Sequence, residues 1–254
     1  MKLEGRTILI TGGTSGIGFE MAKQLIARRN TVLITGRDQR RLEEAKSALP
    51  GVITFQSDAS KPEDIHSLLQ RVTAEFPACD TLFNNAGIMR NLNMNEPRSL
   101  RDVTRELDLN LNGPVQMVQG FLPHLKSRPD ALIVNVSSGL AFVPFPLSPI
   151  YSAAKAGIHA FTRCLRVQLK GSKVTVVELA PPGVETKLLR GEFAAELKGQ
   201  KGMSVEVLVA KAIVGIEAGK IEIRPGLSNV LYFLSRLAPS LPFGQMAKMV
   251  HAAG

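Results

Sequence analysis

The sequence predicts a single α/β domain in which helices cover both faces of a parallel sheet. Short apolar runs alternate with stretches of helical periodicity from residue 6 to about residue 223, the pattern of repeated βα units. The chain has 254 residues, enough to bury one large core. No linker-like tract interrupts the alternation, so a doubly wound sheet of about seven strands is expected within one domain, residues 1–254.

The composition describes a folded, basic protein. Apolar residues make up 44% of the chain, and 31 Lys and Arg against 22 Asp and Glu give a net charge of +9. A positive surface suits an anionic cofactor, a nucleic acid or an anionic membrane surface. Nucleic acid is not expected as a partner, because aromatic residues make up only 5% and no Trp is present to form a stacking platform.

Cysteine and histidine usage excludes two further classes. Cys79 and Cys164 form no CxxC pair, which indicates thiols in a reducing compartment. The histidines show no metal-ligand spacing, so no metal site is expected. No signal-peptide pattern and no apolar run of membrane-spanning length is present, and we expect a cytoplasmic protein.

The first βα unit carries a phosphate-binding pattern. A strand at residues 6–10 runs into the glycine-rich turn TGGTSGIG and then into a helix at residues 19–29. Glycines let the backbone approach a pyrophosphate, and the helix N-terminus favours its negative charge. The turn predicts a dinucleotide site with the candidate residues Gly12, Thr14, Ser15, Gly16, Ile17 and Gly18.

The loop after the second strand, residues 31–35, contains a residue that indicates which cofactor binds. In a dinucleotide fold an Arg here accommodates the 2′-phosphate of NADP, so Arg37 favours NADP(H) over NAD(H). The alternative is that Arg37 is a solvated loop charge. Asp38 is expected to cap the following helix.

The third and fourth strands, residues 52–56 and 80–83, also end in candidate cofactor residues. Asp58 could accept a hydrogen bond from an adenine amino group. Small and amide residues follow the fourth strand and suit a cofactor crevice; these are Asn85, Ala86 and Gly87.

A long helical region from about residue 97 to residue 124 contains Asn110 shortly before Gly113-Pro114. The Gly-Pro pair predicts a kinked helix that points the Asn110 amide inward. A satisfied buried amide is an equally good interpretation of Asn110.

Tyr151 and Lys155 are the central catalytic candidates. They lie four residues apart in a helix expected over residues 151–169, so they share one face. A neighbouring ammonium favours the phenolate and would lower the pKa of Tyr151 from about 10, which would make the phenol a general acid and base. Ser138 follows a buried strand at residues 131–136 and could hydrogen-bond the same substrate oxygen.

The remaining segments are predicted to shape the substrate side. The apolar stretch 140–150 contains three prolines and indicates an irregular wall. A sixth strand at residues 174–179 precedes a substrate lid and helix at about 186–219, although a plain surface helix fits the start of that region equally well. A C-terminal extension, about 226–254, could pack on a partner subunit, cover the pocket or lie on a membrane surface.

Taken together, the motifs resemble those of the short-chain dehydrogenase/reductases. The family's order is kept by TGGTSGIG at 11–18, NNAG at 84–87, Asn110, Ser138 and YSAAK at 151–155. The segments PPGVET and GKIEIRPGLSNVLYFLSRLAP are similar to those of the DltE-like branch. The resemblance implies a Rossmann fold, a nicotinamide cofactor and an association into homodimers or homotetramers.

The resemblance also implies residue roles. A catalytic tetrad would comprise Asn110, Ser138, Tyr151 and Lys155. Tyr151 and Lys155 would also contact the cofactor, Lys155 at the nicotinamide ribose. Val184 would line the cofactor, and Thr186 would lie near its nicotinamide end. We therefore expect an NADP(H)-preferring oxidoreductase that interconverts a small-molecule carbonyl and alcohol. The alternative is a nonenzymatic dinucleotide-binding sensor or assembly protein on the same fold.

Overall fold

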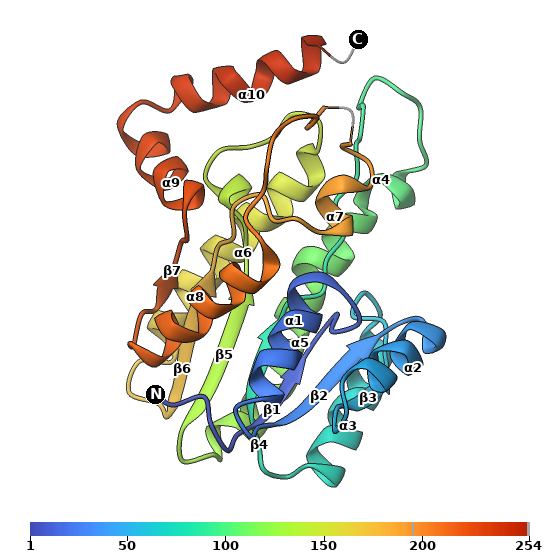
Figure 1. The fold of residues 1–254 in the computed structure, drawn as a ribbon, viewed down its shortest axis with the longest axis vertical. Helices are drawn as coiled ribbons and strands as arrows, with labels where there is room; N and C mark the ends of the chain where they lie inside the picture. The colour runs from blue at the N-terminus through green and yellow to red at the C-terminus, as the bar shows by residue number, and fades with distance from the viewer. Residues whose placement is uncertain (195, 253–254) are drawn as a thin grey trace.

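A seven-stranded sheet lies at the centre of the computed structural model, which describes residues 1–194 and 196–252 (Figure 1). Its strand order is β3-β2-β1-β4-β5-β6-β7, and all pairings are parallel. The predicted doubly wound α/β fold is confirmed. The strands are β1 (Thr7–Ile10), β2 (Thr31–Gly36), β3 (Ile53–Gln56), β4 (Cys79–Asn84), β5 (Ala131–Val136), β6 (Val174–Leu179) and β7 (Glu222–Ile223).

Helices cover both faces of this sheet because successive strand residues point to opposite sides. Ile8 and Ile10 pack toward α1, α2 and α8, whereas Leu9 between them packs toward α3, α5 and α6. The α-helices are α1 (Gly16–Ile26), α2 (Gln39–Ala48), α3 (Pro62–Glu75), α4 (Leu100–Leu107), α5 (Gly113–Lys126), α6 (Pro149–Gln168), α7 (Lys187–Arg190), α8 (Val205–Glu217), α9 (Leu227–Leu237) and α10 (Ser240–Ala252).

The strand order places a crevice at the carboxyl ends of β1 and β4. From β1 the chain moves outward through β2 and β3, and then crosses to β4 on the other side of β1. Such a reversal leaves the loops after the two neighbouring strands diverging, which is where doubly wound folds bind ligands. The loops that follow β1, β4, β5 and β6 all reach this crevice.

The predicted kink near Asn110 is a π-helical turn, η1 (Asp108–Asn112), between α4 and α5. The Gly113 N–H donates to the carbonyl of Asp108, five residues back, and Pro114 has no N–H with which to continue the α-helical pattern. A Cβ atom on Gly113 would lie 2.1 Å from the carbonyl oxygen of Ala59. The kink therefore lets α5 approach the loop after β3 closely.

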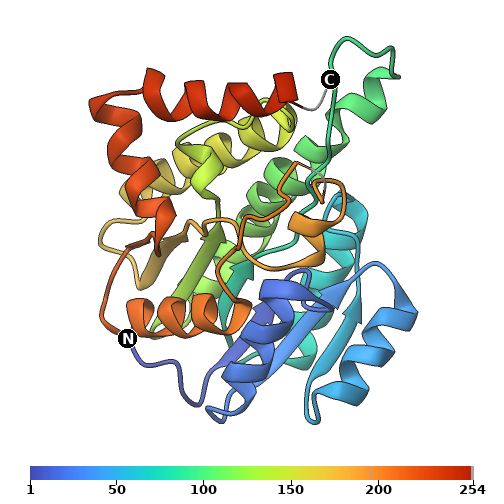
Figure 2. The ribbon, with the colours of Figure 1, turned by 45° about the horizontal axis from the view of Figure 1, so that its top comes forward.

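The C-terminal extension consists of α9 and α10, which lie at one end of the molecule beyond the sheet (Figure 2). None of the described helices has the length and apolar character needed to cross a membrane. The inner side of α9 is buried at Ser228 and Leu231. The extension is thus anchored to the domain along one side of α9.

We expect Gly113→Ala to lower the free energy of unfolding by about 2–3 kcal/mol, because the added methyl group overlaps the Ala59 carbonyl. Gly120→Ala, on the same helix, is the matched control, since its Cβ would lie 3.4 Å from Leu69. Alanine favours a helix, so this control should be unchanged or more stable by up to about 1 kcal/mol. Urea unfolding measures the free energy of unfolding of both variants. Equal values for the two variants would contradict the close contact between Gly113 and the Ala59 carbonyl.

Candidate functional site

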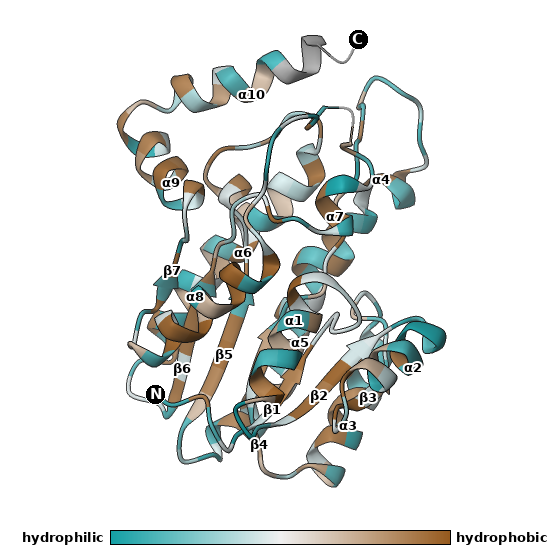
Figure 3. Cartoon of the chain, in the orientation of Figure 1, coloured by the Kyte–Doolittle hydropathy of each residue, from teal (hydrophilic) through white to brown (hydrophobic). Residues whose placement is uncertain are grey.

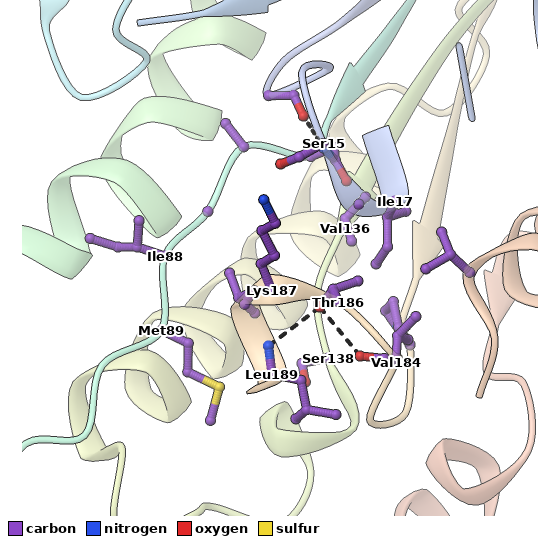
Figure 4. A pocket seen from close by; sticks show the side chains of 18 of the residues that line it. Ser15, Ile17, Ile88, Met89, Val136, Ser138, Val184, Thr186, Lys187 and Leu189 are labelled. Carbon is purple, nitrogen blue, oxygen red and sulfur yellow. Dashed lines mark hydrogen bonds between the residues drawn. The ribbon is translucent and has the colours of Figure 1, made fainter. Parts of the chain in front are cut away.

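A cavity of about 1260 Å³ occupies the crevice at the carboxyl ends of the strands. It extends from Arg37 after β2 to Met246 on α10. Figure 4 shows Ser15 and Ile17 toward one end, and Met89 and Ser138 toward the other. All the candidate site residues of the sequence line this cavity except two, Gly18 and Asn110.

Lys155 is held at the centre of the cavity by the end of β5. Its side chain is buried, and Nζ donates a hydrogen bond of 2.8 Å to the carbonyl oxygen of Val136. Tyr151 lies one turn earlier on α6, with its ring centroid 5.6 Å from the Lys155 Nζ atom. The predicted pairing of Tyr151 and Lys155 on one helix face is present in the structure.

Ser138 lines the same cavity as Tyr151 and Lys155. It follows β5 in an extended conformation and precedes the 3-10 turn η2 (Gly139–Ala141). Its Oγ accepts a hydrogen bond of 3.1 Å from the Leu140 N–H, which fixes the side chain at the start of the turn. A hydroxyl and a phenol are thereby directed into one volume.

The expected lowering of the Tyr151 pKa is wrong for the chain by itself. Burial raises the pKa of Tyr151 to about 12; the Ser138 hydroxyl partly offsets this increase, and the Glu106 carboxylate adds to it. Burial likewise lowers the pKa of Lys155 to about 8. Desolvation is thus the main cause of both shifts, and with its raised pKa the phenol is a proton donor rather than a phenolate near neutral pH.

Asn110 is buried and does not line the cavity. Its Oδ1 accepts from the Ile88 N–H at 3.0 Å, and its Nδ2 donates to the Ile88 carbonyl at 2.7 Å. A Cβ atom on Gly87 would lie 2.9 Å from Asn110 Oδ1. The amide therefore fixes the loop after β4 in place, in agreement with the interpretation of a satisfied buried amide.

The glycine-rich turn presents free backbone donors to the cavity. Ser15 caps α1 in an extended conformation without a side-chain cap bond, and the first N–H groups of any α-helix have no partner within the helix. A Cβ atom on Gly12 would lie 2.8 Å from Ala86 Cα, so this turn contacts the loop after β4 directly. These N–H groups can hold a pyrophosphate.

Gly18 and Asn85 organise that turn from behind. A Cβ atom on Gly18 would lie 2.4 Å from the Gly12 carbonyl oxygen, so Gly18 is required for close packing although it does not line the cavity. The Asn85 side chain donates to the carbonyls of Thr11 and Gly12 at 2.9 and 3.2 Å. Both residues set the shape of the glycine-rich turn.

Charged residues that follow β2 and β3 line the far end of the cavity. Arg37 is exposed there, and Asp38 caps α2 as expected, accepting from the Arg41 N–H at 3.2 Å. The Asp58 Oδ1 atom accepts from the Ser60 N–H and hydroxyl at 3.0 and 2.7 Å. Because Asp38 is engaged at the helix, Arg37 is a positive charge available to a ligand at this end, and Arg41 on α2 lines the cavity beside it.

The other end of the cavity is apolar. Met89, Phe145, Tyr151 and the buried Phe193 form one cluster, against which Leu140, Leu197 and Met246 pack. The rings of Phe145 and Phe193 have centroids 5.6 Å apart. The predicted apolar wall at residues 140–150 is thus joined by residues from the predicted lid and from the C-terminal extension.

The sequence did not single out Met89, Phe193, Leu231 or Met246, which also meet at this end. They come from the loop after β4, the predicted lid and the C-terminal extension, and they share no motif. A weak signal was the apolar character of the extension itself. Leu231 also approaches the Ser138 loop, because a Cβ atom on Gly139 would lie 3.3 Å from its Cδ1 atom.

An aromatic contact joins the same loop to the extension. The ring of Phe142, directly after η2, packs edge-on against Tyr232 on α9 and His159 on α6, with centroid distances of 5.1 Å for each. The turn after Ser138 is therefore enclosed between α6 and α9.

The match to known proteins agrees with this arrangement. A family model described as short chain dehydrogenase matches residues 6–197, and the chain belongs to this family. Within it, the chain is 40% identical over 224 residues to the "Uncharacterized oxidoreductase DltE" of Bacillus subtilis (strain 168), covering 88% of this chain and 89% of that protein. The predicted family and DltE-like branch are confirmed.

Solved structures share the fold. A short-chain dehydrogenase from Burkholderia cenocepacia J2315 in complex with NADP has a TM-score of 0.84 and 23% identity, over 97% of this chain and 99% of that chain. A 3-ketoacyl-(acyl-carrier-protein) reductase from Brucella melitensis complexed with NADH has a TM-score of 0.76 and 28% identity, over 84% and 91%. These neighbours include both an NADP and an NADH complex.

We expect Lys155→Met to raise the free energy of unfolding at pH 7 by about 2 kcal/mol. Lowering the lysine pKa from 10.5 to about 8 corresponds to about 3 kcal/mol of unfavourable burial, and the lost bond to Val136 returns about 1 kcal/mol. The unfolded chain binds the extra proton between these two pKa values, so wild-type stability should rise with pH from about 8 to 10.5. Above this range only the lost hydrogen bond remains, so the difference should reverse and leave Lys155→Met less stable than wild type by about 1 kcal/mol.

Chemical denaturation at several pH values measures this difference. Lys126→Met, at an exposed position in the last turn of α5, is the control and should change little. A Lys155→Met protein that is less stable than wild type at pH 7 would contradict the prediction.

Proposed function

We propose that the protein is an NADP(H)-preferring oxidoreductase that reduces a carbonyl compound with an apolar substituent, or oxidises the corresponding alcohol. The observation that carries this proposal is a shared cavity. The Tyr151 phenol, the Ser138 hydroxyl and the Lys155 ammonium face one volume, and the free N–H groups of α1 line the same cavity. A binding protein would need the turn but has no evident use for three converging proton-bearing groups.

The dinucleotide would lie in the crevice at the carboxyl ends of β1 and β4. The pyrophosphate would bind the N–H groups of residues 15–18, with Arg37 at the 2′-phosphate and Asp58 near the adenine. The Nζ atom of Lys155 would donate a hydrogen bond to the nicotinamide ribose. When bound, the reduced cofactor would supply the hydride. Further lining residues are Gly12, Thr14, Asn85, Ala86, Gly87, Val184 and Thr186.

The chain's own groups would handle the proton. Ser138 and Tyr151 would donate hydrogen bonds to the carbonyl oxygen, so that the charge developing on this oxygen is stabilised. As hydride adds to the carbonyl carbon, the phenolic proton moves to the oxygen and solvent later returns a proton to Tyr151. The raised pKa of Tyr151 keeps the phenol protonated, which supports the reductive direction.

The apolar end would select the substrate. Its carbonyl would face Tyr151, and its apolar part would lie against Met89, Phe145 and Leu231. The segment 186–202 would act as a lid, because Phe193 inserts into this cluster and α7 has only four residues. Assembly into homodimers or homotetramers remains a prediction.

Tyr151→Phe should lower turnover of a carbonyl substrate by at least ~100-fold, because the proton donor is lost while the ring is kept. Its affinity for NADPH should stay within about twofold, because the aromatic ring and the other proposed cofactor contacts are kept. Tyr232→Phe, which changes the second of the two tyrosines, should retain full turnover. The assay follows NADPH absorbance with a panel of apolar ketones and aldehydes.

Near-normal turnover by Tyr151→Phe would rule out this proton donor. Tight NADPH binding by the wild type without turnover of any panel member would instead favour the dinucleotide-binding sensor or assembly protein.

Arg37→Ala should weaken NADPH binding by roughly tenfold and leave NADH binding unchanged, because a charge-assisted bond to the 2′-phosphate is removed. Arg40→Ala is the control: Arg40 lies on α2, where its guanidinium is 3.8 Å from Glu44. Fluorescence titration with both cofactors gives the four affinities. An unchanged preference in Arg37→Ala would remove this residue from cofactor selection.

A further inference from the structure

The C-terminal helices carry an apolar face that the domain leaves uncovered. On α9, Leu227, Val230, Leu234 and Leu237 are spaced by three, four and three residues and so follow one side of the helix, and all are exposed. The adjoining side carries the buried Ser228 and Leu231, since Leu231 lies four residues after Leu227. The apolar surface of α9 is therefore wider than the part that the domain covers.

Exposed apolar side chains are also present beyond this side of α9. Phe233 lies next to it on the helix, and Leu241 and Phe243 near the start of α10 are exposed as well. Leu237 and Leu241 are 82% and 66% exposed, which is unusual for leucines so close in sequence. Figure 3 shows hydrophobic residues along α9, at the end of the molecule away from the sheet. We refer to residues 227, 230, 233, 234, 237, 241 and 243 as the outer face.

The charges of the C-terminal extension itself are positive. The sequence from Ile223 to Gly254 contains no Asp or Glu, and it contains Arg224, Arg236 and Lys248. Arg224 is paired with Glu222, which leaves Arg236 and Lys248 as the cations available to a partner. The guanidinium groups of Arg224 and Arg236 each lie 3.7 Å from the Tyr232 ring centroid, so both are held on α9. Lys248 is exposed on α10.

From these observations we infer that the outer face binds the surface of an anionic lipid bilayer, with α9 and α10 lying in the interface. Apolar side chains would enter the acyl boundary while Arg236 and Lys248 meet lipid phosphates. Helices of 11 and 13 residues are about 16 and 20 Å long, short of the roughly 30 Å hydrocarbon core, so they would lie on the bilayer rather than span it.

Charge distinguishes this partner from a second copy of the chain. Two outer faces packed together would bring Arg236 and Lys248 of both copies into one interface with no acid from either extension. The overall charge of +9 adds to this repulsion, whereas it strengthens attraction to anionic lipid. The inference does not depend on the proposed catalytic activity.

Cosedimentation of the full chain with vesicles tests the inference. Vesicles of phosphatidylcholine with 30% phosphatidylglycerol should bind the protein, and vesicles of phosphatidylcholine alone should bind it at least ~10-fold less well; 0.5 M NaCl should weaken the binding. The double variant Leu237→Glu/Leu241→Glu should lose at least ~10-fold in vesicle affinity, because it removes apolar contacts and adds two negative charges.

Leu100→Glu/Val167→Glu is the matched control, since it makes the same kind of change at exposed positions on α4 and α6. It should bind vesicles like wild type. Failure of the wild type to bind anionic vesicles would overturn the inference, as would equal losses in the two double variants. Light scattering tests the alternative that a second copy of the chain covers the outer face. This alternative would hold if the wild type is an oligomer that does not bind vesicles, and if only Leu237→Glu/Leu241→Glu dissociates this oligomer.

Discussion

The hydrogen bond from Lys155 to the Val136 carbonyl is the constraint around which the site is built. It ties α6 to the end of β5 and holds an ammonium where water has been removed. Tyr151 is positioned one turn away on the same helix, so its place in the cavity follows from this anchor. Gly87 has no side chain at the point where Asn110 and Lys155 approach the loop after β4. One buried cation thus ties the helix to the strand, and the Asn110 amide holds the loop beside them.

One part of the cavity is formed by the segment that matches the family, and the other part includes residues of the C-terminal extension. The glycine-rich turn, the loop after β4 and the Tyr151-Lys155 helix all fall within residues 6–197, the part that matches the family. Leu231 and Met246, which close the apolar end, come from beyond that range. Groups suited to binding a dinucleotide and moving a proton are thus supplied by the shared domain, whereas the shape of the substrate end depends on the extension.

Much of the fold could be predicted because it depends on local pattern. The strand positions follow from apolar runs, and the π turn follows from Gly113-Pro114. The pKa of Tyr151 could not be predicted in the same way, because spacing along a helix shows that Lys155 is near but not how little water reaches either group. The partner of Asn110 is the backbone of Ile88, 22 residues away, and no motif encodes that contact. The convergence of Met89, Phe193 and Met246 likewise exists only after the chain has folded.

The enclosure of the turn after Ser138 has a mechanical consequence. Phe142 packs against Tyr232, and a Cβ atom at position 139 would lie 3.3 Å from Leu231, so α9 and this turn are in direct contact at two places. A tilt of α9 would therefore displace the Ser138 hydroxyl relative to the phenol of Tyr151, which is carried by a different helix. The distance between the Ser138 and Tyr151 oxygen atoms therefore depends in part on the position of α9, and so on any surface that α9 and α10 contact.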